Sequence, residues 1–349
     1  MIKKLLASIP FKVDSFHEID FQGDPGAYYY KILSQNNSFF IKIYERTRET
    51  DFNNEVSNYD LLAEKIKNLP KRHYYSKYDE YNYIIYDFID GESLYSKNNN
   101  GELNQEYYTK LIKNIAQTQS IINSDLKTQT TLEWFKKEFI INVQGNSSIK
   151  SELFEAYKQV DRIVQDIVAK YPGIYSDRNP RNVLISKTGQ LFNIDFEVLF
   201  KCSPIFDFIK LTRNGTDFIE PPSVFSEKLH IFSRQQELAL FKKFIKDIYN
   251  NPEHNLSVVS AEYLSYIYDT CSLFVHLLYI GYCSSELSRQ ENTVKYNRQK
   301  YHLLSAIDSV DKIINSANNR EKSSFMSLKL LLKKICLNQN GVLSLNNQL

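Results

Sequence analysis

The spacing of apolar and polar positions predicts that the chain begins with β-strands. Residues 26–33 and 38–44 are runs of aromatic and β-branched side chains, separated by the polar segment 34–37. Two such runs around a short polar segment are typical of a β-hairpin. A third run, residues 83–89, predicts a buried strand, and the turn signal Asp90-Gly91 ends it.

One helix interrupts these strands. Residues 52–67 carry apolar side chains at helical spacing, namely Val56, Tyr59, Leu62, Ala63 and Ile66. We therefore expect a small β-rich N-terminal lobe over residues 1–90, with a hinge at about residues 86–91. The remaining residues, 92–349, are expected to form a second lobe.

Helical spacing dominates this second lobe. The predicted helices lie near residues 107–120, 132–143, 152–170, 235–249, 257–282, 297–316 and 323–337. Pro172-Gly173 ends the third of them, since neither residue continues a helix well. The expected fold class is α+β, with a small β-rich lobe and a larger helical lobe.

Composition fits a globular protein with balanced charge. The 349 residues are 42% hydrophobic and 24% charged, which is ordinary for a protein with a packed core. The formal net charge is +2, so no field of the whole protein favours nucleic acid or an anionic membrane. We expect no nucleic-acid partner, because such a partner would need a local basic patch.

The cysteines and the first residues indicate a cytoplasmic protein without a membrane span. The four cysteines, Cys202, Cys271, Cys283 and Cys336, form no C-x-x-C pair and show no ligand-like spacing to histidines. A reducing compartment is the simpler interpretation. The apolar run near Met1 is too short for a signal peptide, and the most apolar stretch, 271–283, is too short to span a bilayer.

Lys42 and Glu55 are candidates for an ion pair. Lys42 lies between Ile41 and Ile43 in a predicted strand, so its side chain points away from the face those two occupy. Glu55 falls in the first turns of the helix that follows. A strand lysine with a helical glutamate is the pairing that orients an ammonium group toward phosphates. An exposed lysine is the alternative, and Glu64, farther along the helix, is the rival partner.

Two further segments of the β-rich lobe could contact a nucleotide. Gly23 and Gly26, in F-Q-G-D-P-G, would let a loop approach a phosphate closely, although a simple turn explains them equally. No G-x-x-x-x-G-K-[ST] segment is present, which excludes a Walker-type loop. At the junction of the lobes, the backbone of Asp87 and Ile89 could hydrogen-bond a planar base. An edge strand with a turn is the alternative there.

The richest segment in candidate chemistry is Y-S-D-R-N-P-R-N-V-L-I-S-K-T-G-Q-L-F-N-I-D, residues 175–195. It presents Asp177, then Asn182 five positions later, and two short apolar runs that lead to Asp195. A carboxylate could orient an attacking hydroxyl, and carboxylate and amide oxygens are ligands that Mg²⁺ prefers. Each piece alone also arises by chance, since an Asp after an apolar strand is a common turn or cap.

Taken together, these residues resemble the aminoglycoside phosphotransferase and choline kinase superfamily. Its members carry H-G-D-x-x-x-x-N, I-D-[FW]-E and a D-[LI] that opens a helix. Here the matching segments read Y-S-D-R-N-P-R-N, I-D-F-E and, from Asp207, D-F-I-K-L. The resemblance covers roughly residues 20–215 and implies a bilobal protein-kinase-like fold that uses ATP and Mg²⁺.

The resemblance also implies a role for each candidate residue. Asp177 would act as the catalytic base, and Asn182 and Asp195 would hold the metal ion. Lys42, oriented by Glu55, would bind the nucleotide phosphates. The glycines at 23 and 26 and the backbone at 87 and 89 would complete the nucleotide site.

Several residues depart from the family pattern. Tyr175 replaces a histidine that looks structural in the family, and Ser176 replaces a glycine. Arg178 and Arg181 make the loop basic. Either arginine could contact a phosphate or an acidic substrate, and a solvated loop charge is the simpler interpretation.

The sequence therefore predicts a kinase that phosphorylates a hydroxyl of a small molecule, such as an aminoglycoside, a choline-like amino alcohol or a sugar. A nucleotide-binding protein with weak or no turnover is the alternative that the departures keep open. Tyrosines and phenylalanines between residues 263 and 301 could form a cage for a cationic acceptor, with a packed core as the simpler interpretation. The sequence leaves the acceptor and the oligomeric state undetermined.

Overall fold

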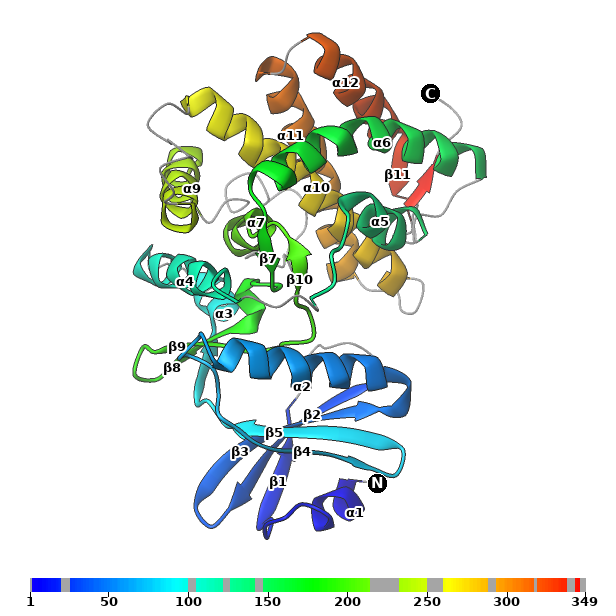
Figure 1. Ribbon diagram of the computed structural model, residues 1–349. Coiled ribbons are helices and arrows are strands. Elements are labelled where there is room, and N and C mark those ends of the chain that lie inside the picture. Colours follow the sequence, from blue (N-terminus) through cyan, green and yellow to red (C-terminus); the bar gives the residue numbers. More distant parts are fainter. Residues whose placement is uncertain are drawn as a thin grey trace. The chain divides into compact units, whose positions relative to one another are not determined.

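The computed structural model describes residues 2–19, 26–99, 105–121, 126–141, 147–213, 232–249, 260–287, 293–316, 319–337 and 343–345. The chain divides into two compact units (Figure 1). Unit one comprises Met1–Glu102, Ser120–Ile122 and Ser176–Leu199, and unit two comprises Leu103–Gln119, Asn123–Tyr175 and Phe200–Leu349. The lobe boundary expected near residue 91 stays a prediction.

Unit one contains a five-stranded antiparallel sheet in the order β1-β2-β3-β5-β4. Its strands are β1 (Ser15–Glu18), β2 (Ala27–Ser34), β3 (Asn37–Glu45), β4 (Arg72–Tyr78) and β5 (Tyr81–Asp87). The predicted hairpin is confirmed, because β2 pairs with β3 from Ala27↔Tyr44 to Ser34↔Asn37. Gln35 and Asn36 make its turn with φ of 48° and 67°, a conformation that asparagine tolerates well.

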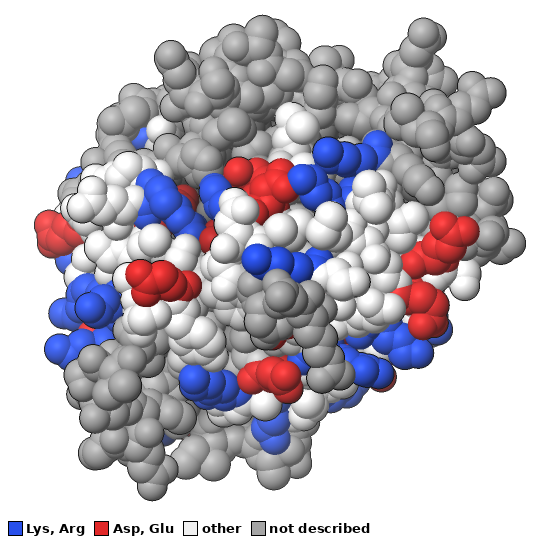
Figure 2. All heavy atoms as spheres, turned by 90° about the horizontal axis from the view of Figure 1, so that it is seen from above, with Lys and Arg blue, Asp and Glu red and all other residues white. Residues whose placement is uncertain are grey.

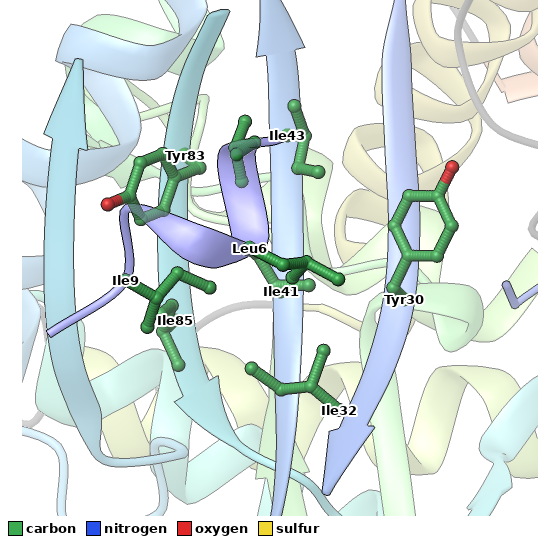
Figure 3. Close-up of a cluster of buried hydrophobic side chains, with 9 residues drawn as sticks. Leu6, Ile9, Tyr30, Ile32, Ile41, Ile43, Tyr83 and Ile85 are labelled. Atoms are coloured by element: carbon green, nitrogen blue, oxygen red, sulfur yellow. The ribbon is translucent and has the colours of Figure 1, made fainter. Parts of the chain in front are cut away.

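One face of this sheet forms a hydrophobic core with the first helix, α1 (Ile2–Ala7), which the sequence analysis did not predict. Figure 3 shows Leu6 and Ile9 lying over Ile41 and Ile85 of the central strands. Alternate residues of a strand share a face, so β2, β3 and β5 each direct every second side chain into this core.

The opposite face of the sheet carries α2 (Glu49–Ala63), which follows β3 through a short 3-10 turn, η1 (Arg46–Arg48). The helix spacing predicted for residues 52–67 is confirmed, although the helix starts and ends earlier. Tyr59 and Leu62 are buried as expected, and Ile66 is buried beyond the helix end, whereas Val56 is half-buried and Ala63 is exposed.

A second, three-stranded sheet in unit one holds the segment richest in candidate chemistry except for its first residue, Tyr175, which belongs to unit two. Its strands run in the order β6-β8-β9, with β6 at Gly91–Ser93, β8 at Val183–Ser186 and β9 at Leu191–Asn193. The 3-10 turn η3 (Pro180–Asn182) leads into β8, and α3 (Leu94–Asn99) follows β6. Gly189 turns the chain between β8 and β9 with a φ of +76°.

Unit two is mainly helical. It contains α4 (Gln105–Thr118), α5 (Thr131–Phe135), the π-helical turn η2 (Lys136–Ile140), α6 (Ser147–Lys170), α7 (Ile205–Arg213), α9 (Arg234–Ile248), α10 (Ala261–Leu287), α11 (Thr293–Ser316) and α12 (Asn319–Lys334). The long helix α10 packs against α7, α9, α11 and η2. The described part of the unit also has two short strand pairs: β7 (Gly173–Tyr175) with β10 (Phe200–Cys202), and β11 (Ile335–Leu337) with β12 (Leu343–Leu345).

The predicted helices of unit two are present with small shifts at their ends. One prediction is wrong in part, because residues 335–337 pair with residues 343–345 as a strand and do not continue the last helix. The run Ile335-Cys336-Leu337 is apolar and contains the β-branched Ile335, which suits a paired strand as well as a helix end.

None of the helices in the described part of the chain is long and apolar enough to cross a membrane. On the face seen in Figure 2, acidic and basic side chains are interspersed among the described residues, and neither sign forms a continuous field. This mixture agrees with the balanced charge of the sequence. The expected cytoplasmic location stays a prediction.

Candidate active site

The site is centred on the ammonium group of Lys42, in the middle of β3. Its Nζ atom lies 2.7 Å from Glu55 Oε2, 3.0 Å from Asp195 Oδ1 and 2.9 Å from Glu197 Oε1. Lys42 is 4% exposed. Burial lowers the pKa of Lys42, but Asp195 and Glu55 outweigh it and hold this pKa well above its usual value. Lys42 is therefore a buried cation that meets three carboxylates.

Glu55 is the innermost of these carboxylates, and hydrogen bonds occupy both of its oxygens. Lys42 and the hydroxyl of Tyr44 donate to Oε2, and the hydroxyl of Tyr86 donates to Oε1 over 2.8 Å. Burial and the adjacent Glu55 carboxylate raise the pKa of both tyrosines well above the usual value, so both remain donors. With its side chain 1% exposed, Glu55 anchors the lysine.

Asp195 and Glu197 form the accessible side of the same cluster. Their side chains are 40% and 15% exposed, in contrast to the 1% of Glu55. One carboxylate oxygen from each of these three residues lies within 4.8 Å of the other two. A set of carboxylate oxygens at this spacing suits a hard cation, and Asp195 and Glu197 are the members such an ion could reach.

The residue between these two acids fixes the loop that carries them. Phe196 is 2% exposed and packs with its ring centroid 5.5 Å from that of Tyr59 and 6.3 Å from that of Tyr86. The side-chain amide of Asn58 donates to the Phe196 carbonyl over 2.8 Å. Asp195 has a φ of +64°, a left-handed conformation that aspartate adopts more readily than most residues. Helix α2 and strand β5 thus hold the acidic loop in place.

Arg48 extends this network of charges. Its Nη2 atom lies 3.0 Å from Glu197 Oε2, and its Nε atom donates to Asp51 over 2.8 Å. Among the described residues, two positive charges, on Lys42 and Arg48, therefore meet four carboxylates, and these six side chains carry two negative charges in excess. A divalent cation would balance that excess.

Asp177 and Asn182 lie on one tight loop ahead of β8. The side-chain amide of Asn182 donates to the Asp177 carbonyl over 3.2 Å, which leaves its amide oxygen for a cation. The Asn182 carbonyl accepts from the backbone N–H of Ile194, the residue before Asp195, over 2.9 Å. This backbone hydrogen bond joins the loop of residues 177–182 to the loop that carries Asp195 and Glu197. Asp177 has a φ of +53°, and such a strained conformation is concentrated at functional sites.

The electrostatics of Asp195 reflect this crowding. Desolvation raises the pKa of its carboxyl above the usual value, Lys42 opposes the shift, and the negative charges of Glu197 and Asp177 add to it. The negative charge of Asp177 is the smallest of these influences on the pKa of Asp195. The crowding of negative charges around Asp195 therefore favours the binding of a cation by this cluster.

The other residues predicted to contact a nucleotide are Gly23, Gly26, Asp87 and Ile89, and their surroundings differ. Gly26 begins the segment leading into β2 with a φ of +84°, and a Cβ atom there would lie 3.3 Å from Cδ of Arg48. Gly23 lies outside the described residues. Asp87 ends β5, where its carboxylate pairs with His73 Nε2 over 2.6 Å and its backbone N–H donates to Lys71. Ile89 is half-buried just beyond β5.

The departures in the loop are largely buried. Tyr175 is 1% exposed and packs within unit two, with ring centroids 4.9 Å from Trp134 and 5.0 Å from Phe200. Arg178 is 2% exposed, so its interpretation as a solvated charge is wrong. A buried guanidinium must be paired. The sequence around Arg178 reads as a surface loop and gave no sign of such a partner. Arg181 is half-buried, with its guanidinium 4.8 Å from the Tyr95 ring centroid.

The aromatic residues of the C-terminal helices are partly core, as the simpler interpretation had it. Tyr268, Phe274 and Tyr301 are at most 2% exposed. Tyr263 is 37% exposed, with Lys170 Nζ 4.6 Å from its ring centroid. The side chains of Tyr282 and Tyr296 lie outside the described set.

The sequence reasoning missed several residues of the cluster. Glu197 stands two residues after Asp195 in I-D-F-E, and this i, i+2 spacing of acids was a usable signal. Tyr44 and Tyr86 share the strand face of Lys42, which the alternation of β3 and the pairing Lys42↔Ile84 would have shown. Arg48 gave no such signal, because its contact with Glu197 spans 149 positions.

The sequence and the structure were both compared with those of known proteins. The sequence matches the phosphotransferase enzyme family over residues 26–238, which is more than half of the chain. A search of curated proteins finds no match.

Solved structures share the fold at low sequence identity. Choline kinase from Cryptosporidium parvum Iowa II is 12% identical with a TM-score of 0.61, over 92% of this chain and 93% of that one. Choline kinase LicA from Streptococcus pneumoniae is 15% identical with a TM-score of 0.57, over 88% and 98%. Spectinomycin phosphotransferase APH(9)-Ia, solved with ADP and spectinomycin, is 14% identical with a TM-score of 0.53, over 94% and 98%. The predicted α+β, protein-kinase-like fold is confirmed.

Proposed function

The chain belongs to the phosphotransferase enzyme family, and we propose that it is an ATP- and Mg²⁺-dependent kinase that phosphorylates a hydroxyl group of a small molecule. The observation that carries this proposal is the cluster around Lys42. One buried ammonium group meets an inaccessible carboxylate, Glu55, and two accessible ones, Asp195 and Glu197. This arrangement suits the transfer of a phosphoryl group from a metal-bound nucleotide.

Lys42 would bind the nucleotide phosphates. Glu55 keeps the ammonium group on the polar face of the sheet, and Tyr44 and Tyr86 keep Glu55 in position. Phe40 and Tyr29 share this face, because Tyr29 pairs with Lys42 and Phe40 precedes it by two residues. Their rings stack with centroids 6.0 Å apart, and a base could rest against such a surface. Gly23, Gly26, Asp87 and Ile89 remain proposed contacts of the nucleotide.

Asp195, Glu197 and Asn182 are the residues that would hold Mg²⁺. The donor set fits, since Mg²⁺ prefers hard oxygen ligands, and the six described charged side chains of the network carry two excess negative charges. Bound there with the nucleotide, the ion would neutralise charge on the transferring phosphoryl group. The backbone hydrogen bond from Ile194 to Asn182 keeps the amide and carboxylate ligands on connected loops.

Asp177 would act as the base for the acceptor hydroxyl. Its side chain is half-buried rather than fully enclosed, and the tight loop of residues 177–182 fixes its backbone. A carboxylate in this position orients the hydroxyl and takes its proton as the bond to phosphorus forms.

The acceptor is proposed as a class. The structures that share the fold include choline kinases and an enzyme that phosphorylates spectinomycin, so amino alcohols and aminoglycosides are the first candidates, followed by sugars. ATP consumption should be measured with aminoglycosides, choline, ethanolamine, sugars and nucleosides as acceptors. Consumption that depends on one acceptor would identify the substrate.

Nucleotide binding is the first test of the proposal. Millimolar Mg-ATP should raise the melting temperature of the chain, because a ligand that binds the folded state stabilises it. ATP without Mg²⁺ should give a smaller shift, since the carboxylate cluster repels bare phosphates. No shift with Mg-ATP would remove the kinase proposal as a whole.

Asp177→Asn tests the base. Turnover with the identified acceptor should fall about 10²–10⁴-fold, because the amide cannot take the proton. The melting-temperature shift with Mg-ATP should stay close to that of the unaltered protein. Binding without acceptor-dependent turnover in the unaltered protein would instead indicate a nucleotide-binding protein that no longer transfers phosphate.

A further inference from the structure

Arg48 is the cation on the outer side of the carboxylate cluster. It ends the 3-10 turn between β3 and α2, and its side chain is 13% exposed. Its guanidinium contacts Glu197 through Nη2 and Asp51 through Nε, as a fork that spans two carboxylates. Its Cδ atom lies 3.3 Å from where a Cβ on Gly26 would be, so Arg48 also borders the end of the glycine-containing segment.

The contacts of Lys42 show which carboxylates must change partner when Lys42 binds a phosphate. An ammonium group has three N–H donors, and Lys42 has three carboxylates within 3.0 Å. To donate to a nucleotide phosphate, Lys42 must release at least one of them. Glu55 is buried and held by two tyrosines, so the carboxylates that Lys42 can release are those of Asp195 and Glu197.

Glu197 divides its two oxygens between Lys42 and Arg48. Oε1 lies 2.9 Å from Lys42 Nζ, and Oε2 lies 3.0 Å from Arg48 Nη2. When Lys42 turns toward phosphate, Oε1 becomes available and Oε2 stays with Arg48. Arg48 then keeps the carboxylate at the site, and Asp51 keeps Arg48 in place.

We propose that Arg48 is a positioning residue that holds Glu197 as a ligand for the metal–nucleotide complex. This inference rests on the proposed function and adds to it a residue outside the segments that match the family motifs. A residue that orients a metal ligand typically contributes about 10–100-fold to metal affinity. Arg48→Gln should therefore weaken metal binding in the nucleotide complex by that factor.

Arg46 provides a matched control within the same turn. It lies two residues before Arg48, its side chain is 71% exposed, and its partner Glu80 is 3.7 Å away and also exposed. Arg46→Gln removes the same charge from the same 3-10 turn without touching the cluster. A general effect of net charge or of the turn would appear equally in both variants.

The measurement is Mn²⁺ binding followed by electron paramagnetic resonance, with the full-length protein and a non-hydrolysable ATP analogue. Arg48→Gln should bind Mn²⁺ about 10–100-fold more weakly, and Arg46→Gln should match the unaltered protein. An Arg48→Gln affinity within twofold of the unaltered protein overturns the inference. If the unaltered protein binds no Mn²⁺–nucleotide complex, the proposed function itself fails.

A double-mutant cycle shows whether Arg48 acts through Glu197. In the Glu197→Gln background, Arg48→Gln should change Mn²⁺ affinity by less than twofold, because the ligand it positions is gone. The full loss of affinity, if it were repeated in that background, would show that Arg48 does not act through Glu197 and would overturn the inference.

If Arg48→Gln does not fold, Arg48→Lys takes its place, because a single ammonium cannot reproduce the fork. Arg48→Lys should then lose at least threefold in affinity, and an unchanged affinity overturns the inference.

Discussion

The two faces of the five-stranded sheet use the same strands for different purposes. On one face, Ile41 and Ile85 are fully buried with α1 in a hydrophobic cluster that contains no charged side chain. On the other, Lys42, Tyr44 and Tyr86 are also at most 4% exposed, yet they enclose charges and hydroxyl groups. Neighbouring residues in β3 therefore differ in chemistry while sharing the same degree of burial.

The two faces of the sheet therefore contribute differently to folding and to the proposed reaction. Burial of each large apolar side chain contributes about 1.5–3 kcal/mol to the free energy of folding. A buried ion pair contributes little net stability, because the loss of hydration offsets the attraction between the charges. We infer that the apolar face supplies the net stability of unit one and that the polar face is retained for the reaction, although removing one partner from it leaves the others buried and unpaired and is therefore costly. Three substitutions can break or sharpen this division.

Lys42→Met should have the largest effect. Transfer activity should fall by at least about 10²–10³-fold, because the cation aimed at the phosphates is lost. The three carboxylates would also lose their shared partner, and breaking a buried pair costs about 3–5 kcal/mol of unfolding free energy. Acceptor-dependent ATP consumption and urea denaturation measure the two effects.

Lys77→Met is the matched control for the lysine. Lys77 lies in the same sheet, its side chain is 57% exposed, and it pairs with Glu49. Its loss should change the unfolding free energy by less than about 0.5 kcal/mol. If Lys42→Met kept full activity, the polar face would have no role in phosphate binding and the division between the faces would fail.

Ile41→Ala tests the apolar face one residue away. Ile41 is 0% exposed, so its truncation should lower the unfolding free energy by about 2–5 kcal/mol. The folded fraction should still show the full melting-temperature shift with Mg-ATP. Ile141→Ala is the control, since Ile141 is 65% exposed and should change stability by less than about 0.5 kcal/mol. Loss of nucleotide binding without loss of stability would contradict the division.

The pairing at the centre of the site could be predicted from sequence. Lys42 alternates with Ile41 and Ile43, and Glu55 follows in the first half of a helix with a clear apolar stripe. The structure joins the two at 2.7 Å and leaves the rival Glu64 exposed at the helix end. Short-range periodicity fixed the direction of each side chain, which was sufficient here.

Contacts between distant segments could not be predicted in the same way. Arg48 meets Glu197 across 149 positions, and no periodic pattern links η1 with the acidic loop. Arg178 was expected in solvent because loops usually carry solvated charges, yet it is 2% exposed. Helix α1 is only six residues long, too short for periodicity to reveal it, and the sheet packing stabilises it.

Tyr86→Phe should have the smallest effect and locates the division most finely. The change removes the 2.8 Å hydrogen bond to Glu55 Oε1 and keeps the ring between Tyr59 and Phe196. A hydrogen bond to a charged group contributes about 1.5–3 kcal/mol, and the unfolding free energy should fall by that amount. Activity should fall less than tenfold, because Lys42 and Tyr44 still hold Glu55.

Tyr75→Phe is the control for this change, because Tyr75 is 46% exposed in the neighbouring strand β4 and its substitution should leave stability nearly unchanged. Urea denaturation and acceptor-dependent turnover of both variants give the comparison. If Tyr86→Phe lost as much activity as Lys42→Met while keeping its stability, Tyr86 would act on the nucleotide directly. The second face would then carry a reactive hydroxyl in addition to the anchor of the lysine.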